Sequence, residues 1–365
     1  MFSPGCEFNS MFAEKHYPES LNPEELDAYL SKGWYRMGQS IFTTHFLCFD
    51  QQFYSAIWVR QDLEGFGFGK RPRKLMRNND RLFRHEIHQG KIDQVKERLY
   101  QRYRRSFPGI LAPTLKDSLL DGEEINIYNT FEVCIYDGDQ LVAFSFFDLG
   151  ADSSASILGV YDPDYRQYSL GFYSMLLEME YSMSLGLKYY YPGYVVPGYS
   201  RFEYKLRIGP VEYFHMETGE WLPYAAIKEE DIPIEKMREK LKAVQQKLSG
   251  SKLYCRVQYY PLFEASLFSF WRANYLDFPI VLNCTPENRD RPLLVVFDTK
   301  HDHYSLVQCS NFDDPNIVFN EGYLNNFSPT RFLTSLMVVN AFWAASDNPQ
   351  EVAETLLDNL QREQG

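Results

Sequence analysis

The chain lacks the patterns that would place it at once among membrane or secreted proteins. None of its apolar runs approaches the roughly 18 residues that a membrane-spanning helix needs. Its first residues, MFSPGCEFNSMFAEKHYPES, lack the basic start and apolar core of a secretory leader. We therefore expect no membrane association and a cytoplasmic location. Hydrophobic residues at 45% and charged residues at 24% are typical of a globular protein.

Paired metal-binding cysteines are also missing. No two cysteines form a Cys-x-x-Cys motif, which favours buried free thiols over a zinc site or a disulfide framework. His85 and His88 are three residues apart, whereas a helical zinc pair is spaced by four, and His45 lies far from both in the sequence. We expect no metal and no cofactor. The cysteines are Cys6, Cys48, Cys134, Cys255, Cys284 and Cys309.

Basic residues are in the minority overall but are concentrated in one segment. The net charge is −12, yet residues 60–105 hold 14 Lys and Arg against 6 Asp and Glu, interleaved with Phe and Tyr. This mixture is typical of a surface that contacts phosphates and stacks on bases, with a solvated, ion-paired helix face as the alternative. The acidic remainder argues against general nucleic-acid binding, so no DNA partner is expected. The candidate phosphate ligands are Arg71, Arg73, Lys74 and Arg77.

Residues 131–195 carry the clearest structural pattern. FEVCIY and QLVAFSFFDLG flank a Gly-containing turn, which predicts a β-hairpin, and SASILGVYDP predicts a third strand. A buried helix then runs from an N-cap at Ser169 to Gly186, before a fourth strand, LKYYYPGY. This order is that of the GNAT-type acyltransferase core, in which the start of the helix holds an anionic group of the acyl donor.

A series of short motifs lies between Tyr161 and Lys205. The motifs are Tyr161-Asp162-Pro163, Ser169-Leu170-Gly171-Phe172-Tyr173, the stretch from Leu185 to Tyr191, Gly193-Tyr194, Pro197-Gly198 and Tyr204-Lys205. In order and spacing the series resembles the C-terminal domain of the arginyl/leucyl-tRNA to protein transferases, which append an amino acid to protein N-termini.

The resemblance extends, more loosely, over residues 20–215, through NPEELDAYLSKGWYRMGQSIF and KRPRKLMRNND. Two departures stand out. The cysteine pairs that hold a metal centre in the family are absent, since Cys6 and Cys48 each stand without a partner. Tyr199-Ser200 replaces a Cys-Pro of the family, while Arg201 keeps the charge of its lysine. The chain is thus identified as a divergent member that lacks the metal centre.

The resemblance implies an aminoacyl-tRNA to protein transferase, with charged tRNA and protein N-termini as partners and arginine or leucine as the transferred residue. Two alternatives stay open. One is a GNAT enzyme that uses acyl-CoA, although the chain lacks the family's glycine-rich pyrophosphate loop. The other is a catalytically degenerate homologue that binds tRNA or a protein partner.

The candidate site combines the resemblance with residue chemistry. We expect the tRNA 3′ end at the start of the helix, where backbone N–H groups point outward, with a plain helix cap as the alternative. For the tyrosines the alternative is half-buried strand aromatics, and for the arginines and Lys205 it is surface ion pairs. Glu178 is predicted to be an ion-pair partner at the helix end, and Glu180 a buried base with a raised pKa. The predicted catalytic residues are Glu180, Tyr204 and Lys205. The predicted ligands of substrate and tRNA are Ser169, Leu170, Gly171, Tyr173, Tyr191, Gly193, Tyr194, Arg201 and Arg207, together with the four basic residues of the 71–77 segment.

The predicted fold class is α+β, with a GNAT-like core between a small β-rich N-terminal domain and an extra α+β module. The domains are expected at residues 1–68, 69–224 with the basic segment, and 251–365, with a connecting helix at 225–250. In the last module, helices are expected over 328–346 and 348–363, the second N-capped by Asn348.

Overall fold

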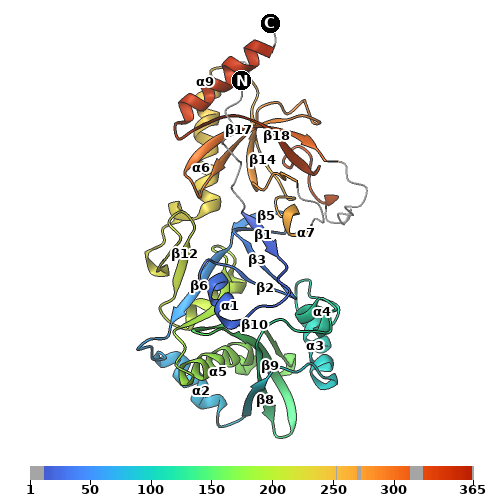
Figure 1. Cartoon of the computed structure of the whole chain (residues 1–365), viewed down its shortest axis with the longest axis vertical. Helices are drawn as coiled ribbons and strands as arrows, with labels where there is room; N and C mark the ends of the chain where they lie inside the picture. The colour runs from blue at the N-terminus through green and yellow to red at the C-terminus, as the bar shows by residue number, and fades with distance from the viewer. Residues whose placement is uncertain (1–11, 252, 269–272, 313–323, 364–365) are drawn as a thin grey trace.

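The computed structural model describes residues 12–251, 253–268, 273–312 and 324–363. Cys6 lies outside them. The molecule is elongated (Figure 1): a five-stranded sheet with helices α6 and α9 forms one end, and an eight-stranded sheet with α2 and α5 forms the other. Strands from the N-terminal part of the chain lie between the two. The helices are α1 (Pro23–Leu30), α2 (Lys70–Asn79), α3 (Gln94–Ser106), α4 (Leu115–Leu120), α5 (Leu170–Ser184), α6 (Pro233–Leu248), α7 (Ala265–Phe268) and α9 (Pro349–Glu363).

The eight-stranded sheet has the order β13-β12-β6-β11-β10-β9-β8-β7. Its neighbouring strands are antiparallel except β10 and β11, which are parallel. The strands are β6 (Ile57–Asp62), β7 (Arg84–Gln89), β8 (Thr130–Asp137), β9 (Gln140–Leu149), β10 (Ser153–Tyr161), β11 (Tyr189–Val195), β12 (Glu212–His215) and β13 (Glu220–Pro223).

The predicted hairpin, third strand, helix and fourth strand are all present. β8 and β9 join through Gly138, whose φ of 57° is a backbone conformation that glycine adopts without strain. The chain continues through β10, the 3₁₀ turn η1 (Pro163–Tyr168) and α5 before it returns as β11. This order confirms the α+β class and the GNAT-like core. Helix α5 covers one face of the sheet, and α3 packs on β9 and β10 through a separate hydrophobic cluster.

The N-terminal strands form a separate small sheet and a hairpin. β1, β2 and β3 pair in the order β1-β3-β2, and β4 pairs with β5. The adjoining strand β6, which also precedes residue 68, pairs with β11 and so belongs to the eight-stranded sheet. The boundary at residue 68 stays a prediction. The strands are β1 (Ala13–His16), β2 (Tyr35–Met37), β3 (Ser40–Thr44), β4 (Phe46–Phe49) and β5 (Gln52–Ser55).

The C-terminal sheet has the order β14-β15-β16-β17-β18 and packs on α6, whose buried residues join its core. The helix predicted over 328–346 is wrong, because Met337–Ser346 forms strand β18 beside β17. A short apolar run does not distinguish a buried helix from a strand. The N-cap predicted at Asn348 is confirmed by its side-chain oxygen, which accepts from the Gln350 N–H at 2.9 Å. The other strands are β14 (Arg256–Tyr259), β15 (Ile280–Asn283), β16 (Leu293–Asp298) and β17 (His303–Asn311).

A buried ion pair fastens the N-terminal strands to the eight-stranded sheet. The Arg36 guanidinium of β2 lies 2.8 Å from the Asp148 carboxylate of β9, and both side chains are almost fully buried. Arg36 also donates to the hydroxyl of Thr130 and to the Leu119 carbonyl. Removing one partner from such a pair leaves an uncompensated buried charge.

We predict that Asp148→Asn lowers the free energy of unfolding by about 3–5 kcal/mol, because Arg36 then remains buried without a counter-charge. Urea titration followed by circular dichroism measures the loss. The control is Lys188→Gln, which breaks the exposed pair between Lys188 and Asp152 and should cause a far smaller loss of stability. Equal losses in the two variants would contradict the structural role of the buried pair.

Candidate active site

The candidate site is the opening between β10 and β11. The two strands pair only from Ser153 to Ala155 and from Tyr189 to Tyr191, and beyond these residues they diverge. The Tyr35 hydroxyl of β2 lies at the point of divergence, where it donates to the Tyr191 carbonyl at 2.8 Å and also contacts the Ser156 carbonyl. Carbonyl groups that the parted strands leave unpaired thus find a donor from outside the sheet.

A buried carboxyl lies on the α5 side of this opening. The Tyr190 hydroxyl donates to Glu178 at 2.7 Å, and neither residue has exposed surface. Burial raises the pKa of Glu178 to about 7, while the nearby hydroxyls of Ser145, Tyr190 and Ser156 act in the opposite direction.

The predicted burial of Glu180 is wrong, because its side chain is exposed. The predicted ion pair of Glu178 is wrong as well, since tyrosine and serine hydroxyls surround its carboxyl. The two glutamates are two residues apart, so the helical period of 3.6 residues places them on opposite sides of α5. Among the acids of this helix, Glu178 therefore takes the place that the sequence reasoning gave to Glu180.

Helix α5 begins after Ser169, but this residue lacks the side-chain hydrogen bond expected of an N-cap. Ser169 has φ 53° and ψ 43°. The first helical bond is donated by Phe172, which leaves the N–H groups of Leu170 and Gly171 ahead of the helical ladder. A Cβ at Gly171 would lie 3.4 Å from the Tyr161 ring, which is an ordinary van der Waals contact.

Two of the predicted ligands at this helix start have buried side chains. Leu170 and Tyr173 have no exposed surface, and the Tyr173 hydroxyl donates to Asp80 at 2.5 Å, just after α2. Direct contact between the Tyr173 side chain and a ligand conflicts with this burial. The whole Leu170 residue is buried, backbone included, whereas Gly171 beside it is partly exposed.

Lys205 lies against the far wall of the opening, in the 3₁₀ turn η2 (Ser200–Arg207). Its ammonium donates to the Tyr194 carbonyl at 3.0 Å and lies over the rings of Tyr194 and Phe202. Burial lowers the pKa of Lys205 to about 7, and no carboxylate offsets this effect. Gly193 has φ 93°, and a Cβ there would lie 3.0 Å from the Lys205 Nζ, so a glycine is required beside this amine.

Tyr204 is the other predicted catalytic residue of the turn. Burial, followed by the charges of Glu178 and Tyr161, raises its pKa to about 12, so the hydroxyl keeps its proton at neutral pH. About 37% of the residue is nevertheless exposed. The structure thus brings Tyr204, Lys205 and Glu178 into one region.

An aromatic cluster borders Lys205. Phe49, from the β4–β5 hairpin, stacks on Tyr199 with ring centroids 5.2 Å apart, and Phe202 lies 6.2 Å from Phe49 and 5.3 Å from Tyr194. Tyr199, at the position of the family's cysteine, therefore has an aromatic partner from a distant part of the chain. Arg201 lies over the Tyr199 and Phe107 rings, and Arg207 over Phe172.

Sequence reasoning missed Glu264, which reaches this wall from the C-terminal module. Its carboxylate accepts from the Thr44 hydroxyl at 3.2 Å, and its charge contributes, after burial, to raising the pKa of Tyr194 to about 12. Burial raises the pKa of Glu264 itself to about 7. Nearby Leu267 joins the hydrophobic cluster that contains Tyr35 and Tyr191. The sequence carries no signal for this contact, because Glu264 lies 70 residues beyond Tyr194 in an unmatched region.

The basic segment lies beside the start of α5. The Asn79 side chain, at the end of α2, donates to the Tyr168 carbonyl at 2.9 Å, one residue before Ser169. Helices α2 and α5 are in contact, as Figure 1 shows. An exposed basic face thus adjoins the start of α5. Its exposed side chains include Arg71, Arg73, Lys74 and Arg77.

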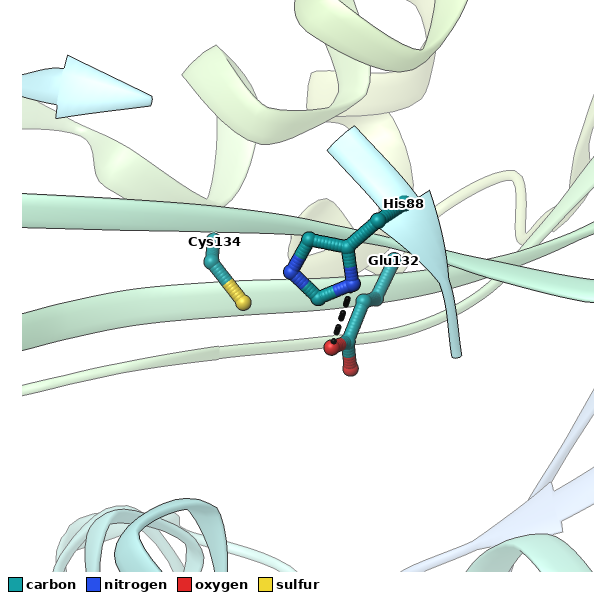
Figure 2. Close-up of side chains that lie close together, drawn as sticks. All are labelled: His88, Glu132 and Cys134. Atoms are coloured by element: carbon teal, nitrogen blue, oxygen red, sulfur yellow. Dashed lines mark ion pairs between the residues drawn. The ribbon is translucent and has the colours of Figure 1, made fainter. Parts of the chain in front are cut away.

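One cluster on β7 and β8 has ligand types suited to a metal (Figure 2). His88 Nδ1 lies 3.1 Å from Glu132 Oε1, and Cys134 completes the group. The Lys96 ammonium, however, lies 2.9 Å from the same Glu132 oxygen and already supplies a cation. Burial and the charge of Glu132 raise the pKa of Cys134 to about 12, which keeps its sulfur protonated. These residues form an ion pair beside a neutral thiol, a donor set that does not favour a metal.

Comparisons with known proteins agree with the sequence motifs. Residues 81–215 match the family model described as arginine-tRNA-protein transferase, C terminus. An aspartate/glutamate leucyltransferase of Leptospira interrogans is 29% identical over 195 residues, which cover 52% of this chain and 74% of the relative. An enzyme of the same name from Acinetobacter baumannii is 28% identical over 164 residues, covering 44% of this chain and 60% of the relative, less than two thirds of its length.

Among solved structures, FemX aligns with a TM-score of 0.32 and 9% sequence identity, over 52% of this chain and 65% of FemX. At that score the fold assignment rests on the strand order described above. In the part of the chain that the structure describes, no helix is both long and apolar enough to cross a bilayer. The strand order, the motifs on α5 and β11, and the matches to arginyl and leucyl transferases show that residues 81–215 are similar to the C-terminal domain of the aminoacyl-tRNA to protein transferases.

Proposed function

We propose that this protein transfers an aminoacyl group from charged tRNA to the α-amine of a protein N-terminus, in the opening between β10 and β11. The observation that carries the proposal is the combination found there. The N–H group of the partly exposed Gly171 lies ahead of the helical ladder and suits an anionic tRNA end, and Lys205, whose pKa is about 7, lies against β11 at the Tyr194 carbonyl.

The tRNA end is proposed to lie along α5 and α2. The N–H group of Gly171, the partly exposed residue at the start of α5, would receive a phosphate or a ribose oxygen of the terminal nucleotides. The exposed basic residues of α2 would then contact the phosphates that precede them, since Asn79 holds the end of α2 against the residue before Ser169.

The chemistry needs little beyond positioning, because the aminoacyl ester is already activated. The acceptor nitrogen attacks the ester carbonyl, a C–N bond forms, and the C–O bond to the tRNA ribose breaks. We assign the oxyanion contact to Tyr204, whose hydroxyl stays protonated and can donate. Lys205 in its neutral form takes the proton from the attacking amine, and this proton finally reaches the departing ribose oxygen.

Glu178 is proposed to act as a positioning residue. It is fully buried, so its carboxyl acts through neighbouring hydroxyls. It accepts from Tyr190, and its charge acts on Tyr204 and Tyr35 across the opening. Loss of this carboxyl would change the place of the hydroxyls that surround the reacting carbonyl.

For the transferred residue we propose leucine over arginine. The aromatic cluster of Phe49, Tyr199 and Phe202 offers an apolar surface next to Lys205, and the curated relatives carry leucyltransferase names. The cations Arg201 and Arg207 nearby favour acceptors that begin with Asp or Glu. Such a reaction would label proteins for an N-degron pathway in the cytoplasm. Glu264 is the feature that favours arginine, because its carboxylate could pair with a guanidinium beside Tyr194.

The direct experiment incubates the purified full-length protein with tRNA charged with labelled leucine or arginine and with peptides that begin with Asp, Glu, Lys or Arg. Transfer of leucine to the Asp and Glu peptides supports the proposal. Transfer of arginine would support aminoacyl transfer but would contradict leucine as the transferred residue. No transfer from either tRNA overturns the reaction and leaves tRNA binding alone. Stabilisation by acyl-CoA with no effect of tRNA would point to an acyl-CoA enzyme.

We predict that Lys205→Arg lowers kcat by about 10²–10⁴-fold, because arginine keeps the charge but cannot lose its proton at neutral pH. The change in KM for charged tRNA should be small. The matched control is Lys188→Arg, on an exposed lysine paired with Asp152, which should leave kcat unchanged. A fully active Lys205→Arg variant would rule out proton transfer to this residue.

The pH dependence follows from the lowered pKa of Lys205. The neutral amine accepts a proton, and its fraction rises with pH, so kcat should increase through pH about 7 and reach a plateau above it. A lysine with an ordinary pKa would place this rise above pH 9. Single-turnover rates from pH 5.5 to 9 distinguish the two cases.

Removing positive charges from α2 tests whether the tRNA phosphates contact this helix. We predict that the double variant Arg73→Gln/Arg77→Gln raises KM for charged tRNA and leaves kcat nearly unchanged. The slope of log affinity against log salt should fall by roughly 1.5, as expected for the loss of two phosphate contacts. The matched control, Lys242→Gln/Lys247→Gln on exposed positions of α6, should change neither quantity. Equal effects of the two double variants would place the tRNA elsewhere.

A further inference from the structure

Two cysteines face each other at the edge of the C-terminal sheet, outside the region that matches the transferase family. In the antiparallel pair β14–β15, Arg256 lies opposite Asn283. Continuing this register by one residue places Cys255, just before β14, opposite Cys284, just after β15. Directly opposed residues point to the same face of a sheet. Both cysteines accordingly belong to the same hydrophobic cluster.

The backbone hydrogen bonds define the type of this pair. Tyr260 donates to the Pro279 carbonyl at 2.9 Å, so the pair formed by these two residues is hydrogen-bonded. Bonded and non-bonded pairs alternate along antiparallel strands, which makes the Cys255–Cys284 pair, five residues further, a non-hydrogen-bonded one. Two further bonds agree: the Cys284 N–H donates to Leu293, on the side of β16, and the Cys255 carbonyl accepts from Gln245 of α6.

This pair type has the spacing that a disulfide needs. Opposed Cα atoms in a non-hydrogen-bonded pair are about 4.5 Å apart. The Cα atoms of disulfide-linked cysteines lie roughly 4.4–6.8 Å apart. A bond between the two sulfurs therefore requires rotation of side chains and no rearrangement of the strands.

The two thiols differ in reactivity. Cys284 is fully buried, whereas Cys255 is only partly buried. The Cys284 thiol donates to the Leu282 carbonyl at 3.6 Å, and the closeness of the two sulfurs lowers the pKa of Cys255 and raises that of Cys284. Cys255 is thus the accessible sulfur that forms a thiolate first, and Cys284 is the protonated thiol held beside it.

We propose that Cys255 and Cys284 form a redox modification site, in which a hydroperoxide oxidises the pair to a reversible disulfide across β14 and β15. The Cys255 thiolate attacks one peroxide oxygen, the O–O bond breaks, and with hydrogen peroxide a sulfenic acid forms while one water molecule is released. The Cys284 sulfur then attacks the Cys255 sulfur and expels a second water molecule. Overall, two thiols lose two protons and two electrons, which reduce hydrogen peroxide to two waters.

The disulfide would tie the edge strand of the C-terminal sheet to its neighbour. Strand β14 pairs with β15 alone among the described strands. A cross-link at its start closes a loop within the module and restricts the unfolded chain, which stabilises the folded module. The proposal does not depend on the transferase reaction, so either can fail without the other.

The test treats the full-length protein with hydrogen peroxide, blocks the remaining thiols, digests the protein without reduction and maps the peptides by mass spectrometry. We expect a cross-linked peptide pair that contains Cys255 and Cys284 and that dithiothreitol separates. The thermal midpoint of the oxidised protein should rise by several degrees and return on reduction.

Three variants sharpen the result. Cys284→Ser should leave Cys255 as a sulfenic or sulfinic acid, and Cys255→Ser should leave Cys284 reduced at a peroxide dose that cross-links the wild type. The control, Cys309→Ser, removes a buried thiol of the same module, whose pKa burial raises to about 12, and should not change the cross-link. The proposal is overturned if either cysteine forms a disulfide with any other residue. It is also overturned if Cys255 of the wild type is oxidised beyond the sulfenic acid while Cys284 stays a free thiol.

Discussion

The parting of two parallel strands is the constraint on which the rest of this structure depends. β10 and β11 share only three residue pairs, and the carbonyl groups beyond Ala155 and Tyr191 would remain unsatisfied without the Tyr35 hydroxyl. This hydroxyl comes from a strand outside the sheet. The buried pair of Arg36 and Asp148 holds that strand in place one residue further along. An open site at the centre of a sheet is thus maintained by contacts that the sheet itself does not supply.

The opening has walls from three parts of the chain. The transferase core supplies Glu178 from α5 and Lys205 from the turn after β11, the β4–β5 hairpin supplies Phe49, and the C-terminal module supplies Glu264. Burial brings the pKa values of Glu178, Lys205 and Glu264 close to 7, so small changes in hydration shift their protonation near neutral pH. The module beyond the matched region therefore contributes to the electrostatics of the candidate site.

Local patterns in the sequence predicted the strands and the helix of the core, but they did not predict which residues form the candidate site. The hairpin at Gly138, helix α5 and strand β11 follow from turn chemistry and periodicity, which act over a few residues. The sequence predicted Glu180 as the buried acid of α5, whereas the structure buries Glu178. A helix with apolar residues on all sides has no pattern that defines which side faces the sheet. Tyr35 and Glu264 depend on contacts across more than 100 and 200 residues, which no local pattern encodes. Segment 337–346 was apolar enough for helix or strand, and pairing with β17 decided the outcome.

The central claim is that the aminoacyl ester reacts between the parted strands. The most direct measurement is a crystal structure of the full-length protein with a hydrolysis-resistant 3′-aminoacylamide of adenosine, which mimics the charged tRNA end. The account predicts that the adenosine lies against the Gly171 N–H group, with the acyl carbonyl beside Tyr204 and Lys205. An analogue bound away from the opening, or one that leaves Lys205 out of contact, would contradict the account.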